Sequence, residues 1–160
     1  MLGRALGVKR VVGVDTSQDR RDLAMQLGLV DDALPSDGDT LGRIATLTGG
    51  LGCEASIDCS GAAPARRIAL AGTRRWGRCA FVGEGGDVQF DVSPLLIHTQ
   101  ITLYGSWVTS LPHMSELVER LVRWGLHPEI TVTHRFDLAD AAQAYRVADE
   151  GQSGKVVLTL

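Results

Sequence analysis

Short apolar runs alternate with amphipathic stretches along most of the chain. Residues 11–15 form a β-branched run that ends at a carboxylate, which is typical of a strand buried on both faces. Residues 19–27 then carry Leu23, Ala24 and Leu27 at the spacing of one helical face, and Gly28 stands where a helix C-cap is expected. The pattern at the start of the chain therefore predicts a strand followed by a helix.

The same alternation continues to the last residue. Strands are predicted at residues 31–34, 55–59, 79–82, 101–107, 132–136 and 155–160, with a further edge strand at 88–92. Helices are predicted at residues 40–47, 64–71, 114–124 and 138–148, and residues 1–6 are typical of the end of a helix with Gly7 as its cap. Strands and helices in this order predict one doubly wound α/β domain with a parallel sheet spanning residues 1–160.

Composition narrows the class of protein. With 160 residues, 44% hydrophobic and 22% charged, the chain is globular and long enough for one domain. A net charge of −3 argues against a nucleic-acid partner, and no apolar stretch approaches the roughly 18 residues of a membrane span. The first residues are too interrupted for a signal peptide, so we expect a cytoplasmic protein. Cys53, Cys59 and Cys79 lack CxxC spacing, which favours buried free thiols over a disulfide.

Asp15 is the most informative single residue. A carboxylate at the carboxyl end of an apolar strand is where dinucleotide-binding folds hydrogen-bond the adenosine ribose, and its charge would repel a 2′-phosphate. This interpretation predicts NAD rather than NADP as the cofactor. An equally weighted alternative is that Asp15 caps the next helix.

The glycine-rich phosphate loop of such folds should lie about 20 residues upstream of that acid. The residues before Asp15 include Gly3, Gly7 and Gly13 but no G-x-G-x-x-G. We therefore expect the chain to begin within a domain, without the first strand and glycine loop. That first strand would be central, between strands 11–14 and 57–59, so we also expect the chain alone to be marginally stable or self-associating.

No set of side chains has the spacing of a metal site or of a nucleophilic triad. The four histidines are scattered and lie near no cysteine pair; they are His98, His113, His127 and His134. Each is better explained as a surface or capping residue than as a ligand. We therefore predict no catalytic residue and no metal ligand in this chain.

An ordered set of short motifs resembles a known family. The motifs are GVKRVVGVD at residues 7–15, DCSG at 58–61, WGRCAFVG at 76–83, LYGS at 103–106 and GKVV at 154–157. Together they resemble the Rossmann-like, C-terminal cofactor-binding region of zinc-type medium-chain alcohol dehydrogenases. The segments GSW at 105–107 and RWGLHP at 123–128 are most similar to the polyol and threonine dehydrogenase branch.

The resemblance implies a role for each matching position. Asp15 would hold the adenosine ribose with Arg20 nearby, and Lys155 would neutralise the pyrophosphate. Three strand ends would complete the cleft: Cys59, Ser60 and Gly61 on the adenine and ribose side, Val82, Gly83 and Glu84 on the nicotinamide side, and Gly105, Ser106 and Trp107 against the carboxamide. The alternatives are a solvated lysine at a strand end and ordinary tight turns at the glycines. The zinc ligands of the family belong to a catalytic domain that precedes this region.

Three functions follow from these observations. The first is the NAD-binding C-terminal half of a zinc-dependent alcohol or polyol dehydrogenase, inactive alone, that transfers a hydride between an alcohol and NAD. The second is a non-catalytic dinucleotide-binding or subunit-interaction module, and the third is a zinc-free reductase of the quinone reductase type. The resemblance also implies a homo-oligomer formed through the edge strand at residues 101–108.

Overall fold

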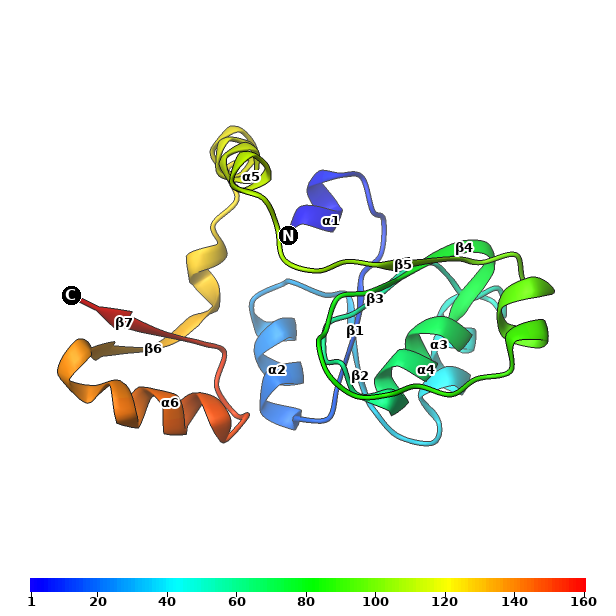
Figure 1. Ribbon diagram of the computed structural model, residues 1–160, viewed down its shortest axis with the longest axis horizontal. Helices are drawn as coiled ribbons and strands as arrows, with labels where there is room; N and C mark the ends of the chain where they lie inside the picture. The colour runs from blue at the N-terminus through cyan, green and yellow to red at the C-terminus, as the bar shows by residue number, and fades with distance from the viewer. The chain divides into compact units, whose positions relative to one another are not determined.

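The computed structural model describes all residues from Met1 to Leu160, and the chain divides into two compact units. The terminal unit contains Met1–Ser36 and Ser110–Leu160, and the middle unit contains Asp37–Thr109 (Figure 1). Every strand pair in both units is parallel. The predicted parallel α/β class is therefore confirmed.

The terminal unit is built from two strand pairs with helices beside them. Its elements are α1 (Leu2–Ala5), β1 (Val12–Asp15), α2 (Gln18–Gln26), β2 (Asp32–Pro35), α5 (Leu111–Arg123), η2 (Pro128–Thr131), β6 (Val132–Asp137), η3 (Leu138–Asp140), α6 (Ala141–Asp149) and β7 (Lys155–Thr159). Strand β1 pairs with β2 and β6 pairs with β7. Ser17 is the N-cap of α2, and its side chain accepts a hydrogen bond from the Arg20 amide. The chain turns away after the helix at Gly28, which has φ +63°.

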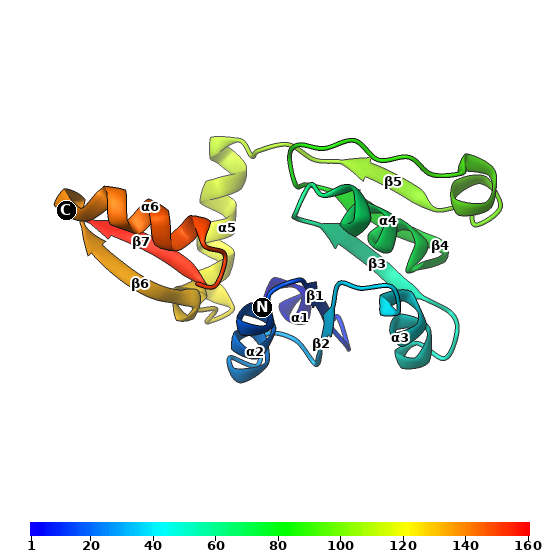
Figure 2. The same ribbon diagram turned by 90° about the horizontal axis from the view of Figure 1, so that it is seen from below.

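The middle unit is a three-stranded sheet covered by helices. Its elements are α3 (Thr40–Leu47), β3 (Cys53–Asp58), α4 (Ala63–Ala71), β4 (Thr73–Phe81), the π-helical turn η1 (Ser93–Ile97) and β5 (Thr102–Gly105). The strands lie in the order β3-β4-β5, and α4 packs against β3 and β4 (Figure 2). Leu70, Cys79 and Ile101 form the buried core, which Phe81 and Phe90 extend. The carboxyl ends of these parallel strands meet at one edge of the sheet.

One predicted strand is wrong. Residues 88–92 pair with no strand, although Val88 and Phe90 are half-buried and alternate with exposed neighbours. Phe90 packs against the core of the middle unit, and η1 begins directly after this segment. The alternation therefore predicts correctly which side chains turn inward here. Packing of those side chains is enough to produce the alternating pattern, even though no neighbouring strand is hydrogen-bonded to this segment.

Strands β1 and β3 each pair on one side only. Strand β1 pairs only with β2 and β3 pairs only with β4, the pairings that a doubly wound order predicts for the strands next to its first one. Val14 on β1 is 38% exposed and Ile57 on β3 is 66% exposed. The unpaired N–H and C=O groups of such an edge, with exposed apolar side chains beside them, favour association with further strands.

The predicted amphipathic helix near residues 114–124 is present as α5. None of its residues is buried, and Val118 and Val122 on its apolar side are exposed.

The cysteines are all free thiols, with Cys79 buried and Cys53 half-buried. Cys59 is exposed, so its predicted burial is wrong, because it lies just beyond the end of β3 where the chain turns. No helix of the chain has the length and apolar character needed to cross a membrane.

Candidate functional site

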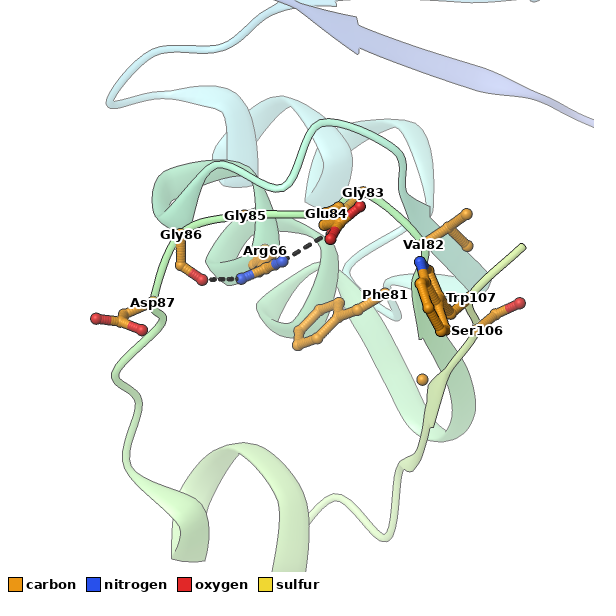
Figure 3. A pocket seen from close by; sticks show the side chains of 11 residues that line it. Arg66, Phe81, Val82, Gly83, Glu84, Gly85, Gly86, Asp87, Ser106 and Trp107 are labelled. Carbon is orange, nitrogen blue, oxygen red and sulfur yellow. Dashed lines mark hydrogen bonds between the residues drawn. The ribbon is translucent and has the colours of Figure 1, made fainter.

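A pocket of about 760 Å³ opens at the carboxyl ends of β4 and β5 in the middle unit. The residues that line it come from α4, from the end of β4 with its following loop, and from the last residue of β5 with the two residues after it (Figure 3). They are Arg66, Phe81, Val82, Gly83, Glu84, Gly85, Gly86, Asp87, Gly105, Ser106 and Trp107. Loops at the carboxyl ends of parallel strands are where α/β folds bind ligands.

Six of the predicted site residues line this pocket together. They are Val82, Gly83, Glu84, Gly105, Ser106 and Trp107. The register explains their meeting, because Phe81 pairs with Gly105 at the last rung of the β4–β5 ladder and both segments then leave the sheet at the same edge. Space beside Gly105 is open, since a Cβ built there would meet no atom within 4 Å. The pocket wall is thus bare backbone at that point.

The loops that follow β3 and β4 touch through their backbones. A Cβ added to Gly83 would lie 2.2 Å from the Gly61 nitrogen, and one added to Gly61 would lie 2.1 Å from the Glu84 oxygen. Gly61 also has φ +73°, a conformation that other residues rarely adopt. Two glycines are therefore required where Cys59, Ser60 and Gly61 pack behind the pocket loop. These three predicted residues support the pocket wall and do not line it.

Asp58 holds both loops from the end of β3. Its side chain is 1% exposed and accepts hydrogen bonds from the Ser60 amide (3.1 Å), the Ser60 hydroxyl (2.7 Å) and the Gly61 amide (3.0 Å). Its main-chain carbonyl accepts from the amides of Val82 and Gly83. A buried carboxylate is stable only with such partners, so this residue fixes the local backbone of both loops.

Arg66 on α4 lies beneath the pocket loop. Its Nη2 donates to the Gly83 carbonyl at 2.8 Å and its Nη1 donates to the Gly86 carbonyl (Figure 3). Nε lies 3.6 Å from Oδ2 of Asp58, an ion pair too long for a hydrogen bond, and the guanidinium lies 5.6 Å from the Phe81 ring centre. Neither Arg66 nor Asp58 was predicted from the sequence as a site residue. The available signal was an arginine in the first turn of the helix that follows DCSG.

Asp15 lies at the end of β1 in the terminal unit. Its Oδ1 accepts a hydrogen bond from the Ser17 amide at 2.8 Å, and its carbonyl accepts from Arg21 Nη1 at 2.7 Å. Ser17, not Asp15, is the N-cap of α2. The alternative that Asp15 caps the helix is therefore wrong, and its half-buried carboxylate keeps acceptor capacity beyond the turn that it closes.

Arg20 and Lys155 belong to the same unit as Asp15. Arg20 Nε donates to the Ser153 carbonyl at 3.2 Å, which ties α2 to the turn before β7. Lys155 is exposed at the first position of β7. Their predicted roles toward a ribose and a pyrophosphate stay predictions, as do those of the nine predicted residues in the middle unit.

The residues of this chain do not form a zinc site. No group of three or more histidine, cysteine, aspartate or glutamate side chains is placed to hold a metal ion. A catalytic zinc needs three protein ligands, so its ligand set does not fit this part of the protein.

Comparisons with known proteins place the chain in a family. The sequence model described as "zinc-binding dehydrogenase" matches residues 1–123. The chain belongs to the zinc-binding dehydrogenase family. It is 43% identical over 159 residues to YphC of Escherichia coli, an uncharacterised zinc-type alcohol dehydrogenase-like protein. The match covers 99% of this chain and 45% of YphC.

Other relatives in this family have named activities. L-threonine 3-dehydrogenase of Bacillus licheniformis is 26% identical over 159 residues, with 98% of this chain and 46% of that protein covered. The crystal structure of an alcohol dehydrogenase from Thermotoga maritima superposes with a TM-score of 0.85 at 25% identity, covering 98% of this chain and 45% of that one. The chain spans about half the length of the relatives it matches.

Proposed function

We propose that this chain is the NAD-binding part of a zinc-dependent alcohol or polyol dehydrogenase. The observation that carries the proposal is the pocket at the carboxyl ends of β4 and β5, where six residues expected around the nicotinamide and its carboxamide come together. The family and its threonine dehydrogenase members favour this reading over a zinc-free quinone reductase type and over a non-catalytic module.

The pocket fits the nicotinamide end of a dinucleotide. Glycine backbone at residues 83, 85, 86 and 105 allows a flat ring to approach closely, and Trp107 offers an apolar face. Residues 82–84 and 105–107 would hold the ring and its amide, and Asp15 would accept from the ribose hydroxyls. Bound NAD supplies hydride transfer, and the zinc-bearing part of the protein would supply the alcohol.

A titration followed by fluorescence tests the proposal. We expect NADH to quench the fluorescence of Trp107 saturably, because that indole lines the pocket, and NADPH to bind more weakly. Trp107→Phe should remove most of the quench, whereas Trp76→Phe, which changes a tryptophan of the same unit outside the pocket, should keep it. Absence of saturable NADH binding by calorimetry and by fluorescence would overturn the proposal.

Three finer proposals accompany this function. The substrate of the whole protein is an alcohol or polyol, as the resemblance to the polyol and threonine dehydrogenase branch suggests. The protein is a homo-oligomer through the edge of β5, where Tyr104 is exposed. It works in the cytoplasm, where three free thiols are stable. Size-exclusion chromatography with light scattering tests the second of these.

A further inference from the structure

The glycine-rich loop at residues 82–86 touches the loop after β3 through backbone atoms of Gly61. Three of its five residues are glycines, and Gly85 and Gly86 have φ values of +92° and +62°. No side chain of this loop makes a hydrogen bond, although Val82 and Gly83 donate their amides to the Asp58 carbonyl. Glycine loses more conformational freedom on ordering than any other residue. Besides that backbone contact, a hydrogen-bonding partner from outside the loop would therefore help its distal part to keep one conformation.

Arg66 is that partner. Its two terminal nitrogens donate to the carbonyls of Gly83 and Gly86, which bracket the distal half of the loop. The side chain is only 12% exposed, and its Nε faces the buried Asp58 carboxylate. Figure 3 shows the guanidinium between the loop and the Phe81 ring, with both donated bonds running to the loop. The guanidinium donates to the two carbonyls from two separate nitrogens while its charge stays near the carboxylate, an arrangement that the single nitrogen of an ammonium does not reproduce.

The geometry points to Arg66 as a positioning residue for the nicotinamide end of the cofactor. By fixing the carbonyls of Gly83 and Gly86, it holds the wall of the pocket formed by residues 82–86 in the shape that receives the ring. This inference rests on the proposed function, because it concerns how the same pocket binds NADH. Arg66 acts through the loop, and Asp58 acts through Arg66 and through the neighbouring turn.

Arg66 should affect binding of only the nicotinamide half of the ligand. ADP-ribose carries the adenosine, pyrophosphate and second ribose of NADH but lacks the nicotinamide. If the loop is not ordered in advance, binding must also provide the free energy that orders it, and the affinity falls accordingly. This cost applies only to ligands that touch the loop. Removing Arg66 should therefore weaken binding of NADH and leave binding of ADP-ribose nearly unchanged.

The test compares Arg66→Met with Arg67→Met. Arg67 is the adjacent arginine of α4 and is exposed, so it controls for the loss of one positive charge from this helix. By calorimetry, Arg66→Met should weaken NADH about 10- to 100-fold and ADP-ribose less than about 2-fold. Arg67→Met should change neither by more than about 2-fold. Hydrogen exchange of the peptide covering residues 82–92 should speed up in Arg66→Met alone.

A conservative variant keeps the test decisive if Arg66→Met does not fold. Arg66→Lys retains the charge opposite Asp58 and can reach one of the two carbonyls, so it should show an intermediate loss for NADH, again without a loss for ADP-ribose. Unchanged NADH binding in folded Arg66 variants would overturn the inference and leave the proposed function standing. Equal losses for both ligands would also overturn it. If the unmodified chain binds neither ligand, the proposed function fails and the inference fails with it.

Discussion

Removal of the Asp58 charge should destabilise the middle unit far more than removal of the Glu54 charge, although both carboxylates on β3 pair with an arginine. The Glu54–Arg74 pair is the closer one, at 2.7 Å against 3.6 Å for Asp58–Arg66. Glu54 is 79% exposed, whereas Asp58 is 1% exposed. Solvent screens the first pair and not the second, so burial and not distance should decide the outcome.

The magnitude follows from what Asp58→Asn leaves behind. The retained oxygen can still accept from Ser60, but the new amide group faces the Gly61 N–H and Arg66 Nε, so donor opposes donor. One lost hydrogen bond to a charged group and one weakened buried ion pair together cost about 3 kcal/mol of the free energy of unfolding. Glu54→Gln should cost less than about 1 kcal/mol, because exposed pairs contribute little.

Urea unfolding measured by far-UV circular dichroism and by tryptophan fluorescence is the assay. Fluorescence reports chiefly on the middle unit, which contains Trp76 and Trp107, while Trp124 lies in the terminal unit. Equal losses of stability for Asp58→Asn and Glu54→Gln, or a loss below about 1 kcal/mol for Asp58→Asn, would refute the reasoning that burial makes Asp58 the anchor of both loops.

Three further predictions test other parts of the chain. Asp15→Ala should reduce the preference for NADH over NADPH by about 1–3 kcal/mol in parallel titrations, and equal affinities in the unmodified chain would contradict the ribose role. Leu70→Ala should lower the free energy of unfolding by about 2–5 kcal/mol because Leu70 is fully buried, whereas Leu51→Ala at an exposed site should change it by less than about 0.5 kcal/mol. Burial raises the pKa of the Cys79 thiol above its usual 9.0. As the pH rises, the unfolded chain therefore loses the thiol proton before the folded chain does, so the free energy of unfolding should fall above pH 9. The fall should be smaller in Cys79→Ala, and urea midpoints measured above pH 9 and at neutral pH check this.

Periodicity predicted the positions of the elements well, but not how deeply each strand is buried. Helix α2 has its apolar side at Leu23, Ala24 and Leu27, which are half-buried as the pattern predicts. Strands β1 and β3 lie where their apolar runs predict them, yet neither buries an apolar side chain. The pattern at residues 88–92 misled because side-chain packing produced it without strand pairing. The start of β4 at Thr73 was also missed, since Arg74 and Arg75 interrupt its apolar pattern and Trp76 adopts φ +58°.

The pocket could be predicted only in part, for a physical reason. The strand-end glycines and Ser106–Trp107 follow from the resemblance of their motifs to the family, and the parallel sheet gathers these strand ends at one edge. Arg66 does not, because its role depends on which way a helical side chain points and on carbonyls that lie 17 and 20 residues further along the chain. Every residue has a main-chain carbonyl, so the residue types do not indicate which carbonyls accept these hydrogen bonds.

The backbone contact between the loops at residues 59–61 and 83–86 has a consequence for how this pocket can diverge. Any side chain at Gly61 or Gly83 would collide with the opposite loop at little more than 2 Å, so both positions are closed to every other residue type. The neighbouring positions Val82, Glu84 and Trp107 are exposed and carry no such constraint. A saturation mutagenesis library selected for folding should thus be almost invariant at the two glycines and diverse at those three positions. New ligand preferences in this pocket would have to arise by changing its lining while the spacing of its two loops stays the same.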